Sequence, residues 1–290
     1  MQVKLLLTKT IRPLIFVAVL FGVTFLLDSC MQFRMSKSEI DHYFENKNPK
    51  AVLKNYYVGK RKQTYLINGD SLKPLVIFVH GSPGSLSAFI DFLADTTLLK
   101  SVRMISVDRP GFGGANFGYA EPSLKKQSAL LKPVLLAHKN NQPVVLVGHS
   151  LGGPLLAQMA LDYPELIDGL IMVAPSIAPE LEPKEWFRAP LATPFLKWML
   201  PRSIRASNDE IYKLKPQLEA LLPHWKEIRT PVVVIQGGKD SLVHPDNAAF
   251  ARRMLVNTTV EVVFVEGMDH FVPWSNPELI REAVLKMSNR

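Results

Sequence analysis

Short, continuous runs of apolar residues recur along this chain of 290 residues and constrain its fold more than any other feature. A strand that is buried on both faces of a sheet has such a composition. Strands that alternate with helices pair in parallel, with helices on both faces of the sheet. The sequence therefore predicts an α/β fold with a mostly parallel, doubly wound sheet. Its buried strands are expected at 74–79, 102–107, 144–147, 167–174 and 231–235, with an antiparallel edge hairpin at 56–67 and a last strand at 260–265.

The composition, with 47% hydrophobic and 21% charged residues, fits one large domain. We expect a leader at 1–29, then a polar arm at 30–55, where Ser36 and Glu39 have the spacing of a capping box that starts a helix. Residues 56–175 and 231–290 contain the strand pattern and form the predicted α/β core.

Residues 176–230 lack the strand pattern and are rich in Pro, Trp and Leu. Prolines interrupt this segment, which predicts short helices separated by turns. We expect the segment, inserted after the strand at 167–174, to form a helical cap over the site. Its aromatic residues are expected mostly to form the cap's own core, while a few face the substrate; they include Trp186, Phe187, Phe195 and Trp198.

The apolar run at 144–147 leads directly into Gly148-His149-Ser150-Leu151-Gly152. A sharp turn from strand to helix needs residues without side-chain bulk two positions before and after the serine, and Gly148 and Gly152 occupy those positions. The amides at the start of the following helix favour an anion that forms beside the serine. The pattern predicts that Ser150 is an activated nucleophile.

The first 29 residues differ from the rest of the chain. Basic residues precede an uncharged run from Pro13 to Leu27, which is shorter than the about 20 residues that a membrane-spanning helix needs. Leu27-Asp28-Ser29-Cys30 resembles the lipobox of bacterial lipoproteins, with the only cysteine of the chain as the lipid-bearing residue, although Asp28 departs from the usual small or apolar residue. Two hypotheses stay open: a lipoprotein lipidated at Cys30, and an uncleaved N-terminal anchor.

Both hypotheses predict a protein attached to a membrane of the cell envelope, with its catalytic part outside the cytoplasm. The formal net charge of +8 is moderate, and the Lys and Arg residues are scattered along the chain. This pattern indicates a weakly basic surface that suits anionic lipid, and it argues against a nucleic-acid partner. Nothing in the sequence predicts the oligomeric state.

The motifs at the strand ends resemble those of the α/β-hydrolase family over about residues 56–290. They follow the family's order: a His80-Gly81 loop, an Asp108-Arg109-Pro110-Gly111 loop, the serine turn, an acid and a histidine. The resemblance implies the α/β-hydrolase fold and a Ser-His-Asp triad.

Within that resemblance, Ser150 is the nucleophile, His270 the base that accepts its proton, and Asp240 the acid that orients the imidazole. His270 follows the last strand and Asp240 follows the strand at 231–235, where the family places these residues. Glu180 is the alternative acid, because some members take it from the preceding strand. Asp269 has a weaker claim, since adjacent side chains on an extended segment point apart.

The resemblance also implies an oxyanion hole formed by the backbone amides of Ser82 and Leu151. His80 is expected to brace the loop that contains Ser82, and His149 is expected to be a packing residue that the turn directs away from the serine. We expect the Asp108 loop to fix loop geometry. The remaining histidines are assigned to the solvated surface; they are His42, His138, His224 and His244.

The first functional hypothesis is a serine hydrolase that cleaves carboxylic esters of small, partly apolar substrates through an acyl-enzyme, without a metal or organic cofactor. A serine at the turn disfavours haloalkane dehalogenase and epoxide hydrolase chemistry, for which the family uses aspartate. Hydrolysis of amide, thioester or carbon–carbon bonds stays open, because the same triad supports it. A non-catalytic envelope binding protein of the same fold is the remaining alternative.

Overall fold

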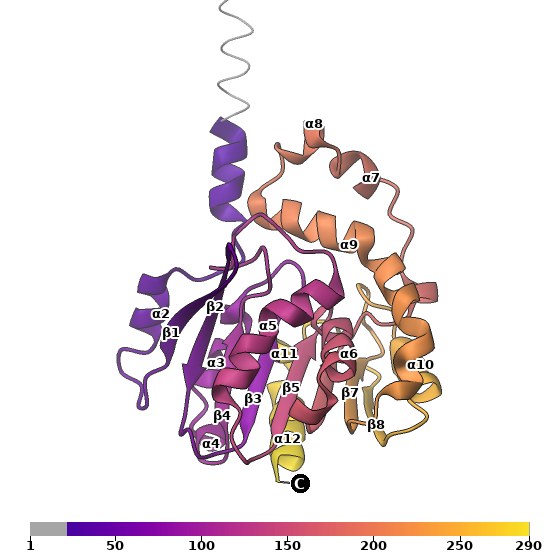
Figure 1. Ribbon diagram of the computed structural model, residues 1–290. Coiled ribbons are helices and arrows are strands. Elements are labelled where there is room, and N and C mark those ends of the chain that lie inside the picture. Colours follow the sequence, from indigo (N-terminus) through magenta and orange to yellow (C-terminus); the bar gives the residue numbers. More distant parts are fainter. Residues whose placement is uncertain (1–21, 290) are drawn as a thin grey trace, which may run out of the picture.

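One sheet of eight strands forms the centre of the protein, whose computed structural model describes residues 22–289 (Figure 1). The strands lie in the order β1-β2-β4-β3-β5-β6-β7-β8, and all neighbours from β4 to β8 are parallel. β1 pairs antiparallel with β2, and β2 antiparallel with β4, so the hairpin lies at one edge as predicted. The strands are β1 (Val52–Val58), β2 (Arg61–Asn68), β3 (Leu75–Val79), β4 (Arg103–Val107), β5 (Val144–His149), β6 (Gly169–Val173), β7 (Val232–Gly237) and β8 (Val260–Val265). The predicted mostly parallel α/β fold is confirmed.

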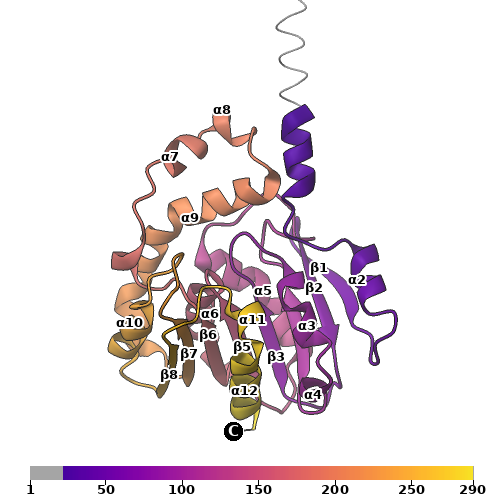
Figure 2. The ribbon, with the colours of Figure 1, turned by 180° about the vertical axis from the view of Figure 1, so that it is seen from behind.

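Helices cover both faces of the sheet, as Figures 1 and 2 show from opposite sides. In β3, Ile77 and Val79 pack on one face, and Val76 and Phe78 pack on the other, because successive side chains of a strand alternate. The first face is covered by α5 (Leu124–His138), α6 (Gly152–Asp162) and α10 (Asn247–Met254). The second face is covered by α2 (Lys37–Tyr43), α3 (Ile90–Leu93), α4 (Thr96–Leu99), α11 (Val272–Ser275) and α12 (Pro277–Ser288). Short 3₁₀ helices, η1 (Leu86–Phe89), η2 (Pro164–Leu166), η3 (Pro179–Leu181) and η4 (Leu222–Glu227), complete the connections.

The helical segment inserted after β6 lies over the carboxyl ends of the strands (Figure 1). It contains α7 (Arg188–Leu191), α8 (Pro194–Lys197) and α9 (Arg202–Leu221). The expectation of short helices holds for α7 and α8 but is wrong for α9, which runs for 20 residues. Its buried residues recur at helical spacing, but half of that stripe is polar, with Ser203, Ser207 and Glu210 beside the leucines. The apolar periodicity that identifies a helix in a sequence is therefore weak here.

The aromatic residues of this segment do not form a core of their own, so that expectation is wrong. Trp186 is 82% exposed and Phe195 is 77% exposed, while Phe187 and Trp198 are about half as exposed. The segment instead packs on the core through Leu214 and Leu218 of α9, which contact Leu151. The short helices α7 and α8 thus lie outermost, with Trp186 and Phe195 toward solvent, whereas Phe187 lines a cavity that Ser82 and Ser150 also line.

Residues 22–30 form a helix that projects from the same side of the protein as α7 and α8 (Figures 1 and 2). The chain then enters α2, whose start is capped by Ser36 and Glu39 as the capping box predicts. Within residues 22–289, no helix has the length and apolar character needed to cross a membrane. Most of the predicted leader, residues 1–21, lies outside the described residues.

Candidate active site

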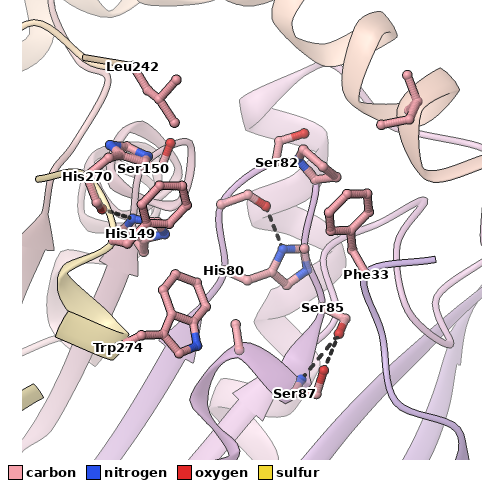
Figure 3. Close-up of a pocket in the computed structure, with 16 residues that line it drawn as sticks. Phe33, His80, Ser82, Ser85, Ser87, His149, Ser150, Leu242, His270 and Trp274 are labelled. Carbon is pink, nitrogen blue, oxygen red and sulfur yellow. Dashed lines mark hydrogen bonds between the residues drawn. The ribbon is translucent and has the colours of Figure 1, made fainter. Parts of the chain in front are cut away.

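A cavity of about 620 Å³ opens at the carboxyl edge of the sheet. Ser150 and His270 lie on one side of it, and Ser82 and Phe33 lie on the other (Figure 3). The apolar part of its lining includes Ile204, Leu242, Phe271 and Trp274. Residues that the sequence analysis singled out therefore meet at one apolar pocket, although they come from distant parts of the chain.

Ser150 occupies the tight turn between β5 and α6, with a φ of 53°. A Cβ added to Gly148 would lie 2.7 Å from the backbone carbon of Gly152, and a Cβ added to Gly152 would overlap the carbonyl oxygen of Val79. The turn therefore requires glycine at both positions. A positive φ is uncommon for a residue with a side chain, and such residues cluster at functional sites. The local geometry is the one predicted from the Gly-x-Ser-x-Gly sequence.

Asp240 and His270 form a buried pair at the ends of the neighbouring strands β7 and β8. The distance from His270 Nδ1 to Asp240 Oδ2 is 2.7 Å. The amides of Leu242 and Val243 donate to Asp240 Oδ1 at 2.9 and 2.8 Å. Burial opposes ionisation of Asp240, but hydrogen bonds from His270 and the two amides outweigh it and hold the pKa of this carboxyl below its usual value. An ionised Asp240 fixes the proton of His270 on Nδ1 and leaves Nε2 as the acceptor nitrogen.

Ser150 Oγ makes no hydrogen bond to His270 among the described residues, although both line the pocket. Catalytic hydrogen bonds are often long before substrate binds. The alternative acids lie elsewhere. Glu180 pairs with Arg253 at 2.7 Å on the surface, and Asp269 accepts a hydrogen bond from the amide of Phe271. Only Asp240 of these three carboxylates contacts His270.

The loop after β3 passes against Ser150 at Gly81 and places Ser82 at the same pocket. A Cβ added to Gly81 would lie 3.0 Å from Cβ of Ser150, so the loop passes directly against the serine. Leu151 is the N-cap residue of α6. Within the described part of the chain, the amides of Ser82 and Leu151 donate no hydrogen bond, which leaves both available to an anion at the serine.

His80 and His149 stabilise this arrangement as neutral imidazoles. His80 Nε2 accepts from the Arg109 amide at 2.9 Å, so its Nδ1–H donates to the Gly81 carbonyl at 2.6 Å. Burial and the nearby Arg109 hold the pKa of His80 well below its usual value. This agrees with the expected bracing of the Ser82 loop.

His149 does more than pack. Its Nε2 lies 2.9 Å from the backbone carbonyl of His270, and its ring lies 4.7 Å from the His270 ring, measured between centroids. Burial, followed by the nearby His270, lowers the pKa of His149 to about 3. A neutral His149 therefore donates to the His270 carbonyl and positions that residue, a role that sequence reasoning missed.

A buried ion pair connects the Ser82 loop to the cap, and the sequence contained no motif for it. Arg109 and Glu210, with side chains 1% and 3% exposed, form a bidentate pair at 3.1 and 2.7 Å. Gln127 Nε2 donates to Glu210 at 3.0 Å, and Arg109 Nη2 donates to the Gly81 carbonyl at 3.2 Å. Burial raises the pKa of Glu210, and its interactions with Arg109 limit the rise. Helix α9 is thereby bonded to the backbone next to Ser82.

Asp108 holds two loops together, in line with the expectation for this motif. Its carboxylate accepts from the amides of Leu86 and Gly114 at 2.7 and 2.6 Å. Burial raises the pKa of Asp108 to about 7. In residues 22–289, no group of three or more His, Cys, Asp and Glu side chains is placed to hold a metal ion.

Cys30 is exposed at the end of the helix formed by residues 22–30. Asp28, the residue that departs from the lipobox pattern, accepts from the Arg202 amide at 2.6 Å and pairs with the Arg202 guanidinium at 2.7 Å. The segment before Cys30 is therefore attached to the start of α9.

Known proteins with similar sequences or structures include several hydrolases. The sn-1-specific diacylglycerol lipase of Mus musculus is 22% identical over 76% of this chain and 82% of its own length. The 2-(acetamidomethylene)succinate hydrolase of Mesorhizobium japonicum is 23% identical over 80% of this chain and 96% of its own. The crystal structure of a membrane phospholipase A, described as a bacterial virulence factor, superposes with a TM-score of 0.62 at 17% identity, and covers 98% of this chain and 97% of that one. This last likeness supports the fold alone.

Residues 76–283 match the alpha/beta hydrolase family, and this range contains the serine turn and both members of the Asp240–His270 pair. The match extends from β3 to α12 and so includes most of the sheet. The chain belongs to the alpha/beta hydrolase family.

Proposed function

We propose that this protein is a serine hydrolase that cleaves carboxylic esters of small, partly apolar substrates through an acyl-enzyme. One observation supports this most directly: the buried Asp240–His270 pair, at 2.7 Å, lies at the same pocket as a serine held at a φ of 53°. A serine hydroxyl is a weak nucleophile at neutral pH, so an oriented base beside it is what acyl transfer requires.

The proposed reaction begins when Ser150 Oγ attacks the ester carbonyl carbon and its proton moves to His270 Nε2. The amides of Ser82 and Leu151 donate to the oxygen anion of the tetrahedral intermediate. Asp240 stabilises the imidazolium that has formed. The bond to the leaving oxygen then breaks, and His270 transfers the proton to the released alcohol.

The acyl group now remains on Ser150 as an ester. Water attacks its carbonyl carbon while His270 Nε2 accepts the water proton. The second tetrahedral intermediate collapses, the acid leaves, and His270 returns the proton to Ser150 Oγ. The two half-reactions use the same residues, and the ester and water are their reactants.

The pocket lining favours an apolar acyl or alcohol group, because aromatic and aliphatic side chains, among them Phe33, Leu242 and Trp274, form a large part of its wall. The named relatives include a diacylglycerol lipase and a hydrolase of 2-(acetamidomethylene)succinate, so hydrolysis of more than one class of substrate has precedent among similar proteins. Amide, thioester and carbon–carbon bond hydrolysis remain the alternative for the same triad. A panel of acyl esters of increasing chain length, with matched amides and thioesters, measures the preference directly.

A fluorophosphonate probe tests the nucleophile. We expect it to label the full-length protein at Ser150 and to leave Ser150→Ala unlabelled. Ser71→Ala changes an exposed serine in the turn before β3 and is the matched control, which should label fully. Folded protein that is not labelled, or labelling that persists in Ser150→Ala, would contradict the proposed function and favour a non-catalytic binding protein.

We also propose the division into a core at 56–175 and 231–290 and a cap at 176–230, preceded by an arm at 30–55. The protein is proposed to attach to a membrane of the cell envelope through its N-terminal segment, with the core outside the cytoplasm. Release of Cys30→Ala from membranes would support lipidation at Cys30. Retention of an unprocessed Cys30→Ala chain would favour the uncleaved anchor.

A further inference from the structure

Four aromatic side chains of the cap are exposed within a stretch of 13 residues. We define the cap aromatic surface as Trp186, Phe195 and Trp198, which lie on and around α7 and α8. Phe187, the fourth, lines a cavity that Ser82 and Ser150 also line. Exposed apolar residues gathered in one place mark sites that bind another molecule or a membrane. Tryptophan in particular is enriched where a protein meets the interface of a bilayer.

The helix at residues 22–30 exposes a second apolar surface beside the first. Phe25 is 74% exposed, and Val23, Leu26 and Leu27 are also exposed. Both ribbon views place this helix and the helices α7 and α8 on the side of the protein opposite the C-terminus (Figures 1 and 2). The Asp28–Arg202 pair and the hydrogen bond from Ser203 Oγ to the Met31 carbonyl attach this helix to α9. The two apolar surfaces thus belong to one side of the molecule.

Charge and chain continuity identify the partner. Residues 184–205 contain five Lys or Arg and a single acidic residue, Glu185. Three of these cations are in ion pairs: Arg188 with Glu185, Lys197 with Asp209 and Arg202 with Asp28. The residues that precede the helix add an uncharged apolar run from Pro13 and, before it, three more basic residues. Exposed aromatic rings among basic side chains suit a bilayer that contains anionic lipid, because the rings enter the interface while the cations remain at the head groups.

The pocket opens next to this side of the protein. Phe33 follows the helix at 22–30, and Ile204 lies in the first turn of α9, and both line the pocket. A bilayer against the cap would therefore lie close to the pocket entrance. An ester with a long acyl chain could then move from the interface to Ser150 without its chain crossing bulk water.

We propose that the cap aromatic surface and the helix at 22–30 together dock on an anionic bilayer and direct the pocket toward it, so that the substrates are esters of membrane lipids. The inference rests on the proposed function, since it identifies the class of ester that reaches the same serine. It also goes further than attachment by the N-terminal segment, because it assigns a membrane contact to the cap.

The test uses the full chain and the double variant Trp186→Ser/Phe195→Ser. Both side chains are largely exposed, so the variant should fold normally. Its matched control is Tyr57→Ser/Leu72→Ser, which removes two exposed apolar side chains from β1 and from the turn before β3. Activity is measured on a long-chain ester embedded in vesicles of phosphatidylcholine with phosphatidylglycerol, and on a soluble short-chain ester.

We expect the cap variant to lose about tenfold or more in activity on the vesicle-embedded ester, the factor that 1.4 kcal/mol of lost binding gives. It should retain its activity on the soluble ester within about twofold, and the control should retain both. Equal activity of the cap variant and the control on vesicles would overturn the inference. If the unaltered protein does not hydrolyse the soluble ester, that result would instead contradict the proposed function.

A second measurement does not depend on catalysis. Brominated lipids in the same vesicles should quench the tryptophan fluorescence of the full chain, and Trp186→Phe should remove a large part of that quenching. Quenching should weaken when phosphatidylglycerol is omitted or salt is raised, since screening weakens attraction between exposed charges. Unquenched Trp186 would overturn the inference. The inference would also be overturned if the chain forms a dimer without lipid, as detected by sedimentation, and Trp186 is buried in that dimer.

Discussion

Removal of the Glu210 carboxylate should destabilise the protein far more than removal of an exposed carboxylate. In Glu210→Ala, Arg109 keeps its charge in a site where its side chain is 1% exposed. Only Gln127 Oε1 and the Gly81 carbonyl, each at 3.2 Å, would still accept from its guanidinium. Loss of one partner of a buried ion pair typically costs about 3–5 kcal/mol, because the other charge is left uncompensated. We expect a loss in this range for the free energy of unfolding.

The Glu180–Arg253 pair is the matched control within the same chain. Its N–O distance is also 2.7 Å, but its side chains are 50% and 59% exposed. Exposed pairs contribute about 0–1 kcal/mol. Glu180→Ala should therefore cost less than about 1 kcal/mol and leave turnover unchanged, since Glu180 lies away from the pocket.

The double variant Arg109→Met/Glu210→Met separates the cost of an unpaired charge from the value of the pair. Replacing both partners by apolar side chains removes the uncompensated charge, so most of the stability should return. Turnover of this double variant should be low, because a methionine at position 109 cannot donate to the Gly81 carbonyl next to Ser82. Loss of one oxyanion-hole donor lowers kcat by about 10²–10³. This factor is the largest decrease in kcat that we expect from displacement of the Ser82 amide.

Urea unfolding followed by circular dichroism at pH 8 gives the free energies, and a soluble ester gives kcat and KM. Glu210→Ala within about 1 kcal/mol of the unaltered protein would refute the reasoning, since it would mean that the pair is hydrated in solution. A double variant with full kcat would show that Arg109 stabilises the fold without positioning the Ser82 loop.

Three further predictions concern the serine turn and the histidines. Asp240→Asn should reduce kcat by about 10⁴ with little effect on folding, because the wrong tautomer of His270 then faces Ser150; a decrease of less than tenfold in ester turnover would contradict this. Gly152→Ala should yield little soluble protein, since the added Cβ would overlap the Val79 carbonyl oxygen, whereas Gly267→Ala, which has open space at its Cβ, should express normally. Burial lowers the pKa of His149 to about 3, and an unfolded histidine titrates near 6.5, so below about pH 6.5 the unfolded chain binds a proton that the folded chain does not. Stability should therefore fall as the pH falls from about 6.5 toward 3, by up to about 1.4 kcal/mol per pH unit from this residue, and urea unfolding of His149→Gln should show a shallower pH dependence than that of the unaltered protein.

The sheet and the serine turn could be predicted from the sequence because their determinants are local. A strand buried on both faces needs an apolar run, and each predicted run became a strand within two residues of its expected start. The Ser150 turn likewise depends on two glycines that are adjacent to it in the chain. Asp240 and His270 were identified only through the order of family motifs, since nothing in their own surroundings distinguishes them from other residues at strand ends.

The remaining features were decided by tertiary structure. Glu210 lies 101 residues from Arg109, and His149 contacts a carbonyl 121 residues away, so no local pattern identifies either contact. In the polar stripe of α9, Glu210 bonds Arg109 and Gln127, and Ser203 bonds the Met31 carbonyl; hydrophobic periodicity cannot indicate such contacts. The cap aromatics are as apolar in sequence as core residues, but whether a side chain is buried depends on what packs against it. Local composition determined the strands and the serine turn, whereas burial, pairing and exposure depended on contacts between distant segments.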